Sequence, residues 1–319
     1  MRLLLAAGLA LLSVASAQAA TDFPTKPVRI IVAFPPGGGT DIVARLIGQK
    51  LTEVWNQQVI IDNRAGAAGV IGTELAAQAA PDGYTLFVGT LGNLAVNQHL
   101  YPSMKVNTVR DFAPVTQIVN VHFSAMAYPG FPPNTIQELI AYAKAKPGVV
   151  NYSSSGAGGA PHLAGTLLAR MAGIDITHVP YKGSNPSFAD LVAGQVQLTF
   201  DSLIQGLPFI REGKLKALAV LGETRSPLLP EVPTVGETVP GFSLTNWFAM
   251  VAPIATPPEI VAKIATDARA VIKQDDTRAK LAAMAADAVG NAPEEFGKVL
   301  RDDTEKWGRV VKEANIRAD

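Results

Sequence analysis

The feature that most constrains this 319-residue sequence is a strand signal that runs directly into a proline- and glycine-rich loop and then into a helix signal. Five of the six residues from 28 to 33 are apolar and four are β-branched, which is typical of a strand buried on both faces of a parallel sheet. Two prolines then end the strand, and Gly37–Gly39 let the backbone turn close to a ligand. We expect Thr40 or Asp41 to cap a helix that continues from Ile42.

A helix that begins in such a loop presents unpaired N–H groups and about half a positive charge at its N-terminus. It can therefore bind a carboxylate or a phosphate without a basic side chain, although an ordinary glycine-rich connection would have the same sequence. The loop lacks the Gly-Lys-Ser/Thr ending of a P-loop, and its glycines are consecutive, unlike those of the dinucleotide-binding motif. Both nucleotide-binding classes are thus disfavoured.

The N-terminus has the order of a secretory signal peptide. Arg2 precedes an apolar stretch, and Ala17-Gln18-Ala19 forms an A-x-A cleavage site, so we predict a signal peptide over residues 1–19, cleaved near Ala19/Ala20. The apolar stretch is too short to span a bilayer comfortably. Because the chain has no cysteine, a lipid-modified cysteine, a disulfide and a thiolate metal site are all excluded. We expect an exported protein without a membrane anchor.

Charge and composition exclude further classes of function. The sequence has 27 Lys and Arg against 27 Asp and Glu, which gives no reason to expect nucleic acid as a partner. Its four histidines lack paired metal-ligand spacing, so we expect no metal and no cofactor. A mature chain of about 300 residues with this apolar content can bury two domain cores.

The first third alternates strand and helix signals, with further strands at 58–62 and 84–89. Such alternation indicates a mainly parallel sheet, and ligands of these sheets bind beyond the carboxyl ends of the strands. Three loops, at 34–40, 66–69 and 90–93, should meet at that edge. We therefore expect the binding site to be formed there by several loops together.

Three basic side chains lie near the expected site. Arg64 can bind an acidic ligand, but a salt bridge to a neighbouring aspartate or a contact with loop carbonyls is favoured. Lys182 is interpreted by default as a solvated loop lysine. His122 is equally compatible with a structural role and with a ligand contact.

A second set of strand and helix signals follows, with strands at 149–153, 174–179, 196–200 and 215–221. The loops after these strands are rich in glycine and hydroxyl groups, which suits hydrogen bonding of a small polar ligand. Ser154 or Ser155 with His162 suggests a serine hydrolase, but the chain has no G-x-S-x-G elbow and no evident acid behind the histidine. The hydrolase is therefore kept only as an unlikely alternative.

Two long extended segments, at 115–128 and 242–253, are predicted to cross between the domains. Three amphipathic helix signals, at 258–273, 276–286 and 293–314, then close the chain and should pack on the first sheet. The predicted domain limits are 20–121 for the first part of domain 1, 122–224 for domain 2, and 225–319 for the return crossing and the helices that complete domain 1.

Six motifs in order along the chain resemble those of Bug-type (TctC-like) receptors, the extracytoplasmic binding components of tripartite tricarboxylate transporters. They comprise residues 27–41 (PVRIIVAFPPGGGTD), 63–69 (NRAGAAG), 81–86 (PDGYTL), 151–156 (NYSSSG) with His162-Leu163, 179–184 (VPYKGS) and 228–234 (LLPEVPT). The resemblance implies an α/β, two-domain periplasmic binding protein of type II-like architecture, with a mainly parallel sheet flanked by helices in each domain and a ligand cleft between them.

The same resemblance implies a non-enzymatic receptor that closes on a small carboxylate, an aliphatic or aromatic dicarboxylate above all, and delivers it to membrane permease subunits. We expect a monomer in the periplasm; a sensor that presents its ligand to a signalling partner is the alternative. The family holds the carboxylate through backbone amides, hydroxyls and waters. The ligand-binding residues that the resemblance implies are Phe34, Gly38, Gly39, Thr40, Thr90, Gly92, Asn93, Ser153, Ser155, His162, Tyr181, Gly183, Ser184 and Asp201.

The sequence departs from the family pattern at one place in the expected site. A Ser or Thr usually lies between Gly158 and His162, whereas this chain has Gly159-Ala160-Pro161. This difference indicates a different or bulkier ligand. Phe34 and Tyr181 can hold an aromatic ring between them or simply pack beside the hinge.

Overall fold

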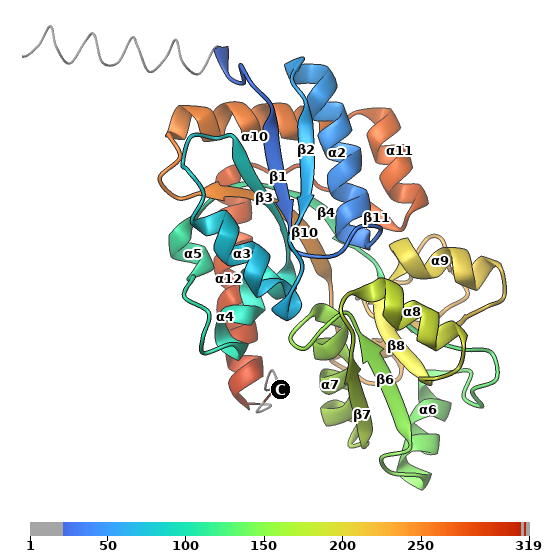
Figure 1. The fold of residues 1–319 in the computed structure, drawn as a ribbon. Helices are drawn as coiled ribbons and strands as arrows, with labels where there is room; N and C mark the ends of the chain where they lie inside the picture. The colour runs from blue at the N-terminus through green and yellow to red at the C-terminus, as the bar shows by residue number, and fades with distance from the viewer. Residues whose placement is uncertain (1–21, 314–315, 317–319) are drawn as a thin grey trace, which may run out of the picture.

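Two β-sheets with flanking helices form the two lobes of the protein (Figure 1). The computed structural model describes residues 22–313 and residue 316, so the predicted signal peptide lies outside the described residues. The first sheet has the order β11-β4-β10-β3-β1-β2 and consists of β1 (Val28–Val32), β2 (Val59–Asn63), β3 (Thr85–Thr90), β4 (Phe112–Val121), β10 (Asn246–Pro253) and β11 (Ala286–Ala288).

The second sheet has the order β7-β6-β8-β5-β9. It consists of β5 (Phe123–Ala127), β6 (Val150–Ser154), β7 (Ile176–Pro180), β8 (Leu198–Ser202) and β9 (Lys216–Val220). Strands within the strand–helix units, such as β1 with β2 and β3, or β6 with β7 and β8, pair in parallel. The crossing strands β10 and β5 pair antiparallel with their neighbours, so each sheet is mixed. The predicted two-domain α/β fold is confirmed, but the prediction of a mainly parallel sheet in each domain is wrong, because β5, β10 and β11 enter their sheets antiparallel.

The chain passes between the sheets at His122 and again between β9 and β10. His122 links β4 to β5, and its Nε2 lies 2.8 Å from a carboxylate oxygen of Asp287. Its backbone N–H also donates to Ala285, so it has a structural place at the crossing. The exact domain limits at residues 122 and 224 stay predictions.

The helices of the first lobe come from both ends of the chain. C-terminal α10 and α12 contact β4, and the Trp55 indole of α2 donates to Asp267 of α10 at 2.6 Å. The helical elements of this lobe are α2 (Gly39–Trp55), η1 (Ala67–Gly69), α3 (Val70–Ala77), the π-helix η2 (Gly92–Val96), α4 (Asn97–Leu100), α5 (Thr108–Asp111), α10 (Pro258–Ile272), α11 (Asp275–Ala283) and α12 (Pro293–Glu313).

The helices of the second lobe flank its five-stranded sheet (Figure 1). They are α6 (Ile136–Ala145), α7 (Ala160–Ala172), α8 (Ser184–Val192) and α9 (Leu203–Arg211), and a short turn η3 (Val235–Glu237) follows in the return segment. α7 and α9 both contact β8, whose apolar residues Leu198 and Phe200 are fully buried. The apolar residues of this predicted strand therefore lie in the core of the second lobe, as expected for a buried strand.

The cap of α2 differs from the sequence prediction. Gly38 is the N-cap, in an extended conformation and without a side-chain hydrogen bond to the helix, so neither Thr40 nor Asp41 caps it. Both residues instead lie in the first turn, because the helix begins two or three residues earlier than the side-chain pattern indicates. Asp41 accepts a hydrogen bond from the N–H of Gly37, which precedes the cap, at 2.9 Å.

Candidate functional site

A cleft with about 550 Å³ of unfilled space, part of it open to solvent, lies between the lobes. Parts of both sheets end toward it, as expected for strands followed by ligand-binding loops. Eight of the predicted ligand-binding residues line this cleft: Phe34, Gly38, Gly39, Thr40, Thr90, Ser155, Ser184 and Asp201. Their role in binding stays a prediction.

Four helices begin at the cleft. Gly39 opens α2 in the first lobe, while Ala160, Ser184 and the N-cap Ser202 mark the starts of α7, α8 and α9 in the second. The first-turn N–H groups of a helix have no intrahelical acceptor and carry the positive end of the helix dipole. The cleft therefore presents partial positive charge from both lobes.

The cleft has little formal charge of its own. Among its described lining residues none is Lys, Arg or His, and Asp201 is the one charged side chain. This carboxyl group is buried and accepts hydrogen bonds from the backbone N–H of Ser202 at 2.7 Å and from the Ser184 hydroxyl at 2.9 Å. Burial raises the pKa of Asp201 to about 6, against the two hydrogen bonds that lower it. A protonated Asp201 can donate a hydrogen bond to an anion.

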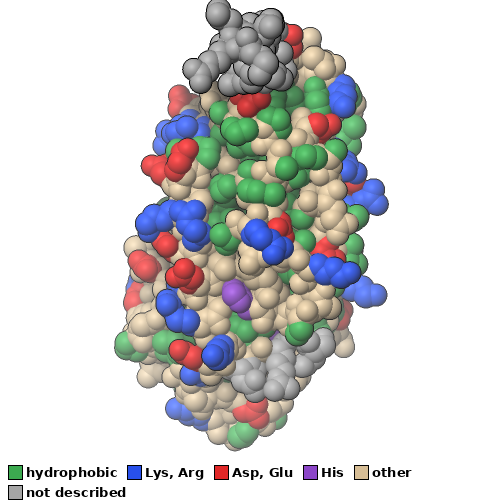
Figure 2. All heavy atoms as spheres, turned by 90° about the vertical axis from the view of Figure 1, so that its left-hand side faces the viewer, with side chains coloured by type: hydrophobic (Ala, Val, Ile, Leu, Met, Phe, Trp, Pro, Cys, Tyr) green, Lys and Arg blue, Asp and Glu red, His purple; other side chains and the backbone are tan. Residues whose placement is uncertain are grey.

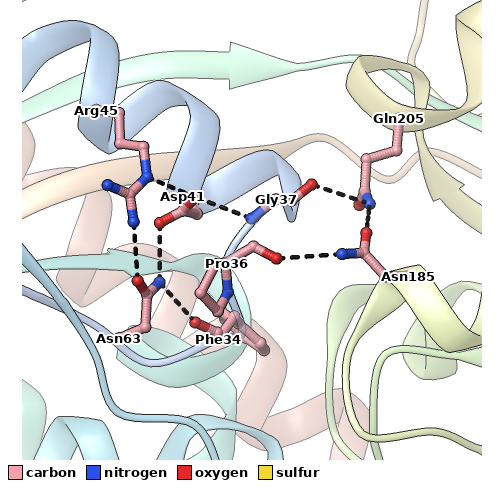
Figure 3. Close-up of polar contacts among 8 residues, drawn as sticks. All are labelled: Phe34, Pro36, Gly37, Asp41, Arg45, Asn63, Asn185 and Gln205. Atoms are coloured by element: carbon pink, nitrogen blue, oxygen red, sulfur yellow. Dashed lines mark hydrogen bonds and ion pairs between the residues drawn. The ribbon is translucent and has the colours of Figure 1, made fainter.

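A hydrogen-bond network fixes the shape of the first loop (Figure 3). The buried Asp41 carboxylate accepts from Gly37 N, Arg45 Nε and Asn63 Nδ2, each at 2.9 Å. Asn63 Nδ2 also donates to the carbonyl of Phe34 at 3.0 Å. Burial alone would raise the pKa of Asp41, but the hydrogen bonds from these donors together lower it. Asp41 thus braces the loop as a carboxylate, behind the residues that line the cleft.

Two side chains of the second lobe reach across to this loop (Figure 3). Asn185 of α8 donates to the carbonyl of Pro36 at 3.1 Å. Gln205 of α9 donates to Asn185 at 2.7 Å and accepts from the N–H of Gly39 at 3.4 Å. Gln205 therefore accepts the hydrogen bond of the first N–H group of α2, which is one of the groups that would donate to a bound anion.

Two predicted residues of the third loop, Gly92 and Asn93, do not line the cleft. Asn93 is fully buried, and its Oδ1 accepts from the backbone N–H of Thr90 at 2.6 Å and from the Thr90 hydroxyl at 3.0 Å. It therefore positions Thr90, which does line the cleft. Gly92 packs against the second lobe, because a Cβ there would lie 3.4 Å from the Cα of Gly159.

Ser153 and His162 also lie away from the cleft lining. Ser153 is inside β6, where its hydroxyl accepts from Ser187 at 2.7 Å within the second lobe. His162 is the third residue of α7, and its Nδ1 accepts from the backbone N–H of Gly158 at 3.0 Å. This contact resembles a capping box, in which the third helical side chain reaches back over the helix start.

The last two predicted residues, Tyr181 and Gly183, line a neighbouring space that we call the second cavity. It lies beside the cleft and shares Phe34, Pro35 and Ser155 with it. Residues 66–69 of the first lobe, which were expected at the binding edge, line this cavity too, together with Ala65. Tyr181 and Phe34 therefore face a common space, while Tyr181 does not line the cleft itself.

Two basic residues have the expected surroundings. Arg64 forms a salt bridge of 2.9 Å with Asp62, which is the favoured sequence interpretation. Lys182 is exposed, and no described residue forms a hydrogen bond or an ion pair with its side chain. It lines the second cavity but not the cleft.

Ten residues that line the cleft were not predicted. Some of them have a local sequence signal that could have identified them, and the others do not. Gly159, Ala160 and Pro161 belong to a glycine-rich helix start, so the helix-terminus argument that identified Gly38 and Gly39 could have found them. Pro35 belongs to the loop 34–40, which the sequence also marks. No local signal marks the other six, because they lie on crossing strands or near other helix starts and reach the cleft only through the fold: Phe123, Asn185, Ser202, Gln205, Asn246 and Phe248.

Ser154 does not form the serine hydrolase arrangement with His162. Ser154 is fully buried and its Oγ lies 2.6 Å from His178 Nε2, not beside His162. The two histidine rings stack with centroids 3.9 Å apart. Burial, and to a lesser degree His162, lowers the pKa of His178 to about 3. Ser154 and His178 thus form a buried polar contact that leaves no access for a substrate.

Residues 22–313 show neither a membrane-spanning helix nor a metal cluster. No helix in this part of the chain is long and apolar enough to cross a bilayer. No three His, Asp or Glu side chains of the described residues come together as metal ligands would. On the face shown in Figure 2, Lys and Arg side chains are interspersed with Asp and Glu.

Comparisons with known proteins agree with this geometry. The model of the tripartite tricarboxylate transporter family receptor matches residues 43–316. A solved structure described as R. palustris Rpa4515 with adipate is 36% identical, has a TM-score of 0.90 and covers 92% of this chain and 99% of that one. MatC from Rhodopseudomonas palustris with bound malate is 33% identical, with a TM-score of 0.86 and coverage of 91% and 100%.

The periplasmic binding protein BugD is 32% identical to this chain, with a TM-score of 0.87 and coverage of 92% of this chain and 99% of BugD. BugD is thus described as a periplasmic binding protein, and the other two structures are described with a carboxylate, adipate or malate. Because the family model and the structures match nearly the whole described chain, the protein belongs to the Bug-type receptors of the tripartite tricarboxylate transporter family.

Proposed function

We propose that this protein is a periplasmic receptor that binds a small carboxylate, an aliphatic or aromatic dicarboxylate, and delivers it to the permease subunits of a tripartite transporter. The observation that carries this proposal is the convergence of four helix N-termini on a cleft without basic lining residues. Such termini bind anions through main-chain N–H groups. The adipate and malate in the similar structures support a carboxylate as the anion.

Binding is coupled to closure because the anion-binding groups are divided between the lobes. α2 begins in the first lobe, and α7, α8 and α9 begin in the second. A ligand that contacts both sets has a higher affinity for the closed form than for the open form, and it shifts the population toward closure. Asn185 and Gln205 stabilise the same closed form through their contacts to the first loop.

Titration calorimetry of the mature protein tests the ligand class. We expect adipate, malate or another carboxylate of a mono- and dicarboxylate panel to bind, and a neutral sugar and a simple cation to give no heat of binding. Binding of the sugar or the cation, with no carboxylate bound, would refute the proposal.

Delivery and location need a separate test in cells. We expect osmotic shock to release the mature protein, and we expect deletion of its gene to abolish uptake of the carboxylate identified by calorimetry. Copurification with permease subunits would support delivery. Uptake that is unchanged in the deletion strain, together with a lost transcriptional response to the same acid, would indicate the sensor role instead.

A further inference from the structure

The function proposed above uses the cleft and gives no role to the second cavity. It contains about 1030 Å³ of unfilled space, part of it open to solvent, between residues 65–69 and Tyr101 of the first lobe and residues 155–157 and 180–183 of the second. Phe34, Pro35 and Ser155 line both it and the cleft. A molecule lying along Phe34 and Ser155 can therefore extend from one space into the other.

Most of the lining of the second cavity offers apolar contact. Alanine, glycine and proline make up much of the wall, and the two tyrosine hydroxyls are engaged elsewhere. Tyr101 donates to the carbonyl of Ala157, and Tyr181 donates to Asp190 at 2.6 Å. Their rings therefore supply aromatic surface. Phe34 and Tyr181 both line this space, so both rings are available to contact the body of a ligand.

One charge completes the lining. Lys182 is the one charged residue of the described wall, and its ammonium group has no hydrogen bond or ion pair to a described residue. The neighbouring cleft takes its anion at helix N-termini, without basic side chains. A cation in the wall of an otherwise largely apolar space thus complements a second anionic group, beyond the one that binds in the cleft.

The loop that forms one wall is held in an unusual conformation. Gly66, Ala67, Ala68 and Gly69 all have positive φ angles, with 45° at Ala67 and 48° at Ala68. Such conformations cost free energy for alanine and concentrate at sites that clamp ligands. The carbonyl of Ala68 also accepts from Asn97 at 2.9 Å, so the surrounding structure maintains this wall.

We propose that the second cavity is the distal half of the ligand site, where the apolar body of a long or aromatic dicarboxylate lies between Phe34 and Tyr181 and its second carboxylate pairs with Lys182. This inference rests on the proposed function, because the first carboxylate must occupy the cleft. It narrows the ligand class from small carboxylates in general to dicarboxylates whose two charges are well separated.

Calorimetry with four probes tests this inference: succinate, suberate, octanoate and terephthalate. Suberate or terephthalate should bind at least about tenfold more tightly than succinate. Ala157→Leu narrows the second cavity and should weaken that longer diacid about tenfold, while succinate changes by less than about twofold. Ala65→Leu narrows the second cavity from the opposite wall, and it replaces Ala157→Leu in this test if that variant does not fold. Ala270→Leu, on the exposed face of α10, is the matched control and should change nothing.

Lys182→Gln should weaken suberate by about two- to fivefold, as expected for a partly exposed ion pair, and leave octanoate unchanged. Succinate that binds as tightly as the longer diacids, or wall variants that weaken all four probes equally, would overturn the distal site while leaving the receptor function intact. If no probe and no other carboxylate binds the wild-type protein, the proposed function itself fails.

Discussion

Asp201→Asn isolates the effect of the one carboxyl group in the cleft. Burial raises the pKa of Asp201 from 3.8 to about 6. A shift of about 2 pKa units corresponds to about 3 kcal/mol, since each unit is about 1.4 kcal/mol. Because the folded-state pKa is the higher one, the contribution of this group to stability is fully present below about pH 4 and is lost as the pH rises through about 6. At neutral pH the folded protein thus holds an unfavourable buried charge.

The asparagine variant removes that charge and keeps the shape. Its amide oxygen can still accept from Ser202 N–H, and the Ser184 hydroxyl can rotate to accept from the new NH₂ group. We expect the variant to gain free energy of unfolding relative to wild type as the pH rises, by about 3 kcal/mol between about pH 4 and pH 7.5. Urea unfolding of the ligand-free proteins at several pH values measures this difference.

Ligand binding should follow the same titration. In the wild-type protein, carboxylate affinity should fall about tenfold or more between about pH 6 and pH 8, as Asp201 becomes charged beside the ligand. The variant should bind with little pH dependence over this range. A stability difference that is constant with pH, or the same pH dependence of binding in both proteins, would refute the assignment of this titration to Asp201.

Two further predictions concern the loop and the contacts across the cleft. Asp41→Asn should lower the free energy of unfolding by about 2 kcal/mol at neutral pH, because hydrogen bonds to a buried carboxylate are lost, and it should also weaken ligand binding. The control Asp302→Asn, at an exposed ion pair on α12, should lower the free energy of unfolding by less than about 0.5 kcal/mol. Equal losses in the two variants would contradict the bracing role of Asp41. Because the folded-state pKa of Asp41 is lowered, its contribution to the free energy of unfolding should be lost as the pH falls through this lowered pKa. The double variant Asn185→Ala/Gln205→Ala should give a larger radius of gyration by small-angle X-ray scattering without ligand, and an unchanged radius would count against these contacts.

The parts of the site predicted from sequence are those whose signals are local. A glycine-rich loop after a buried strand predicts a helix start, and α2 and α7 both begin at such loops. The edge on which the loops meet follows from strand and helix alternation alone. Gly39 and Thr90 could therefore be expected at one edge from their loops, whereas Ser184 was implied only by the family resemblance; all three line the cleft.

The remaining residues depend on packing that a linear pattern does not contain. Ser153 and Ser155 are two residues apart in the same loop region, yet Ser153 lies inside β6 and bonds to Ser187, while Ser155 follows the strand and lines the cleft. Asn246 lies on β10, which reaches the cleft only because the returning chain inserts between β3 and β4. The raised pKa of Asp201 likewise follows from burial, which appears only once both lobes are in place.

Release of the ligand follows from the same division of the site. With its anion-binding groups on helix starts of two lobes, neither lobe alone offers the complete set of N–H donors. Opening therefore removes part of the binding free energy at once, whereas a basic side chain on a flexible stem could follow the ligand as the lobes separate. Gln205 of the second lobe accepts from Gly39 N–H across the cleft, so opening of the lobes breaks this contact as well. A site built from main-chain dipoles can thus be specific for carboxylates and still deliver them.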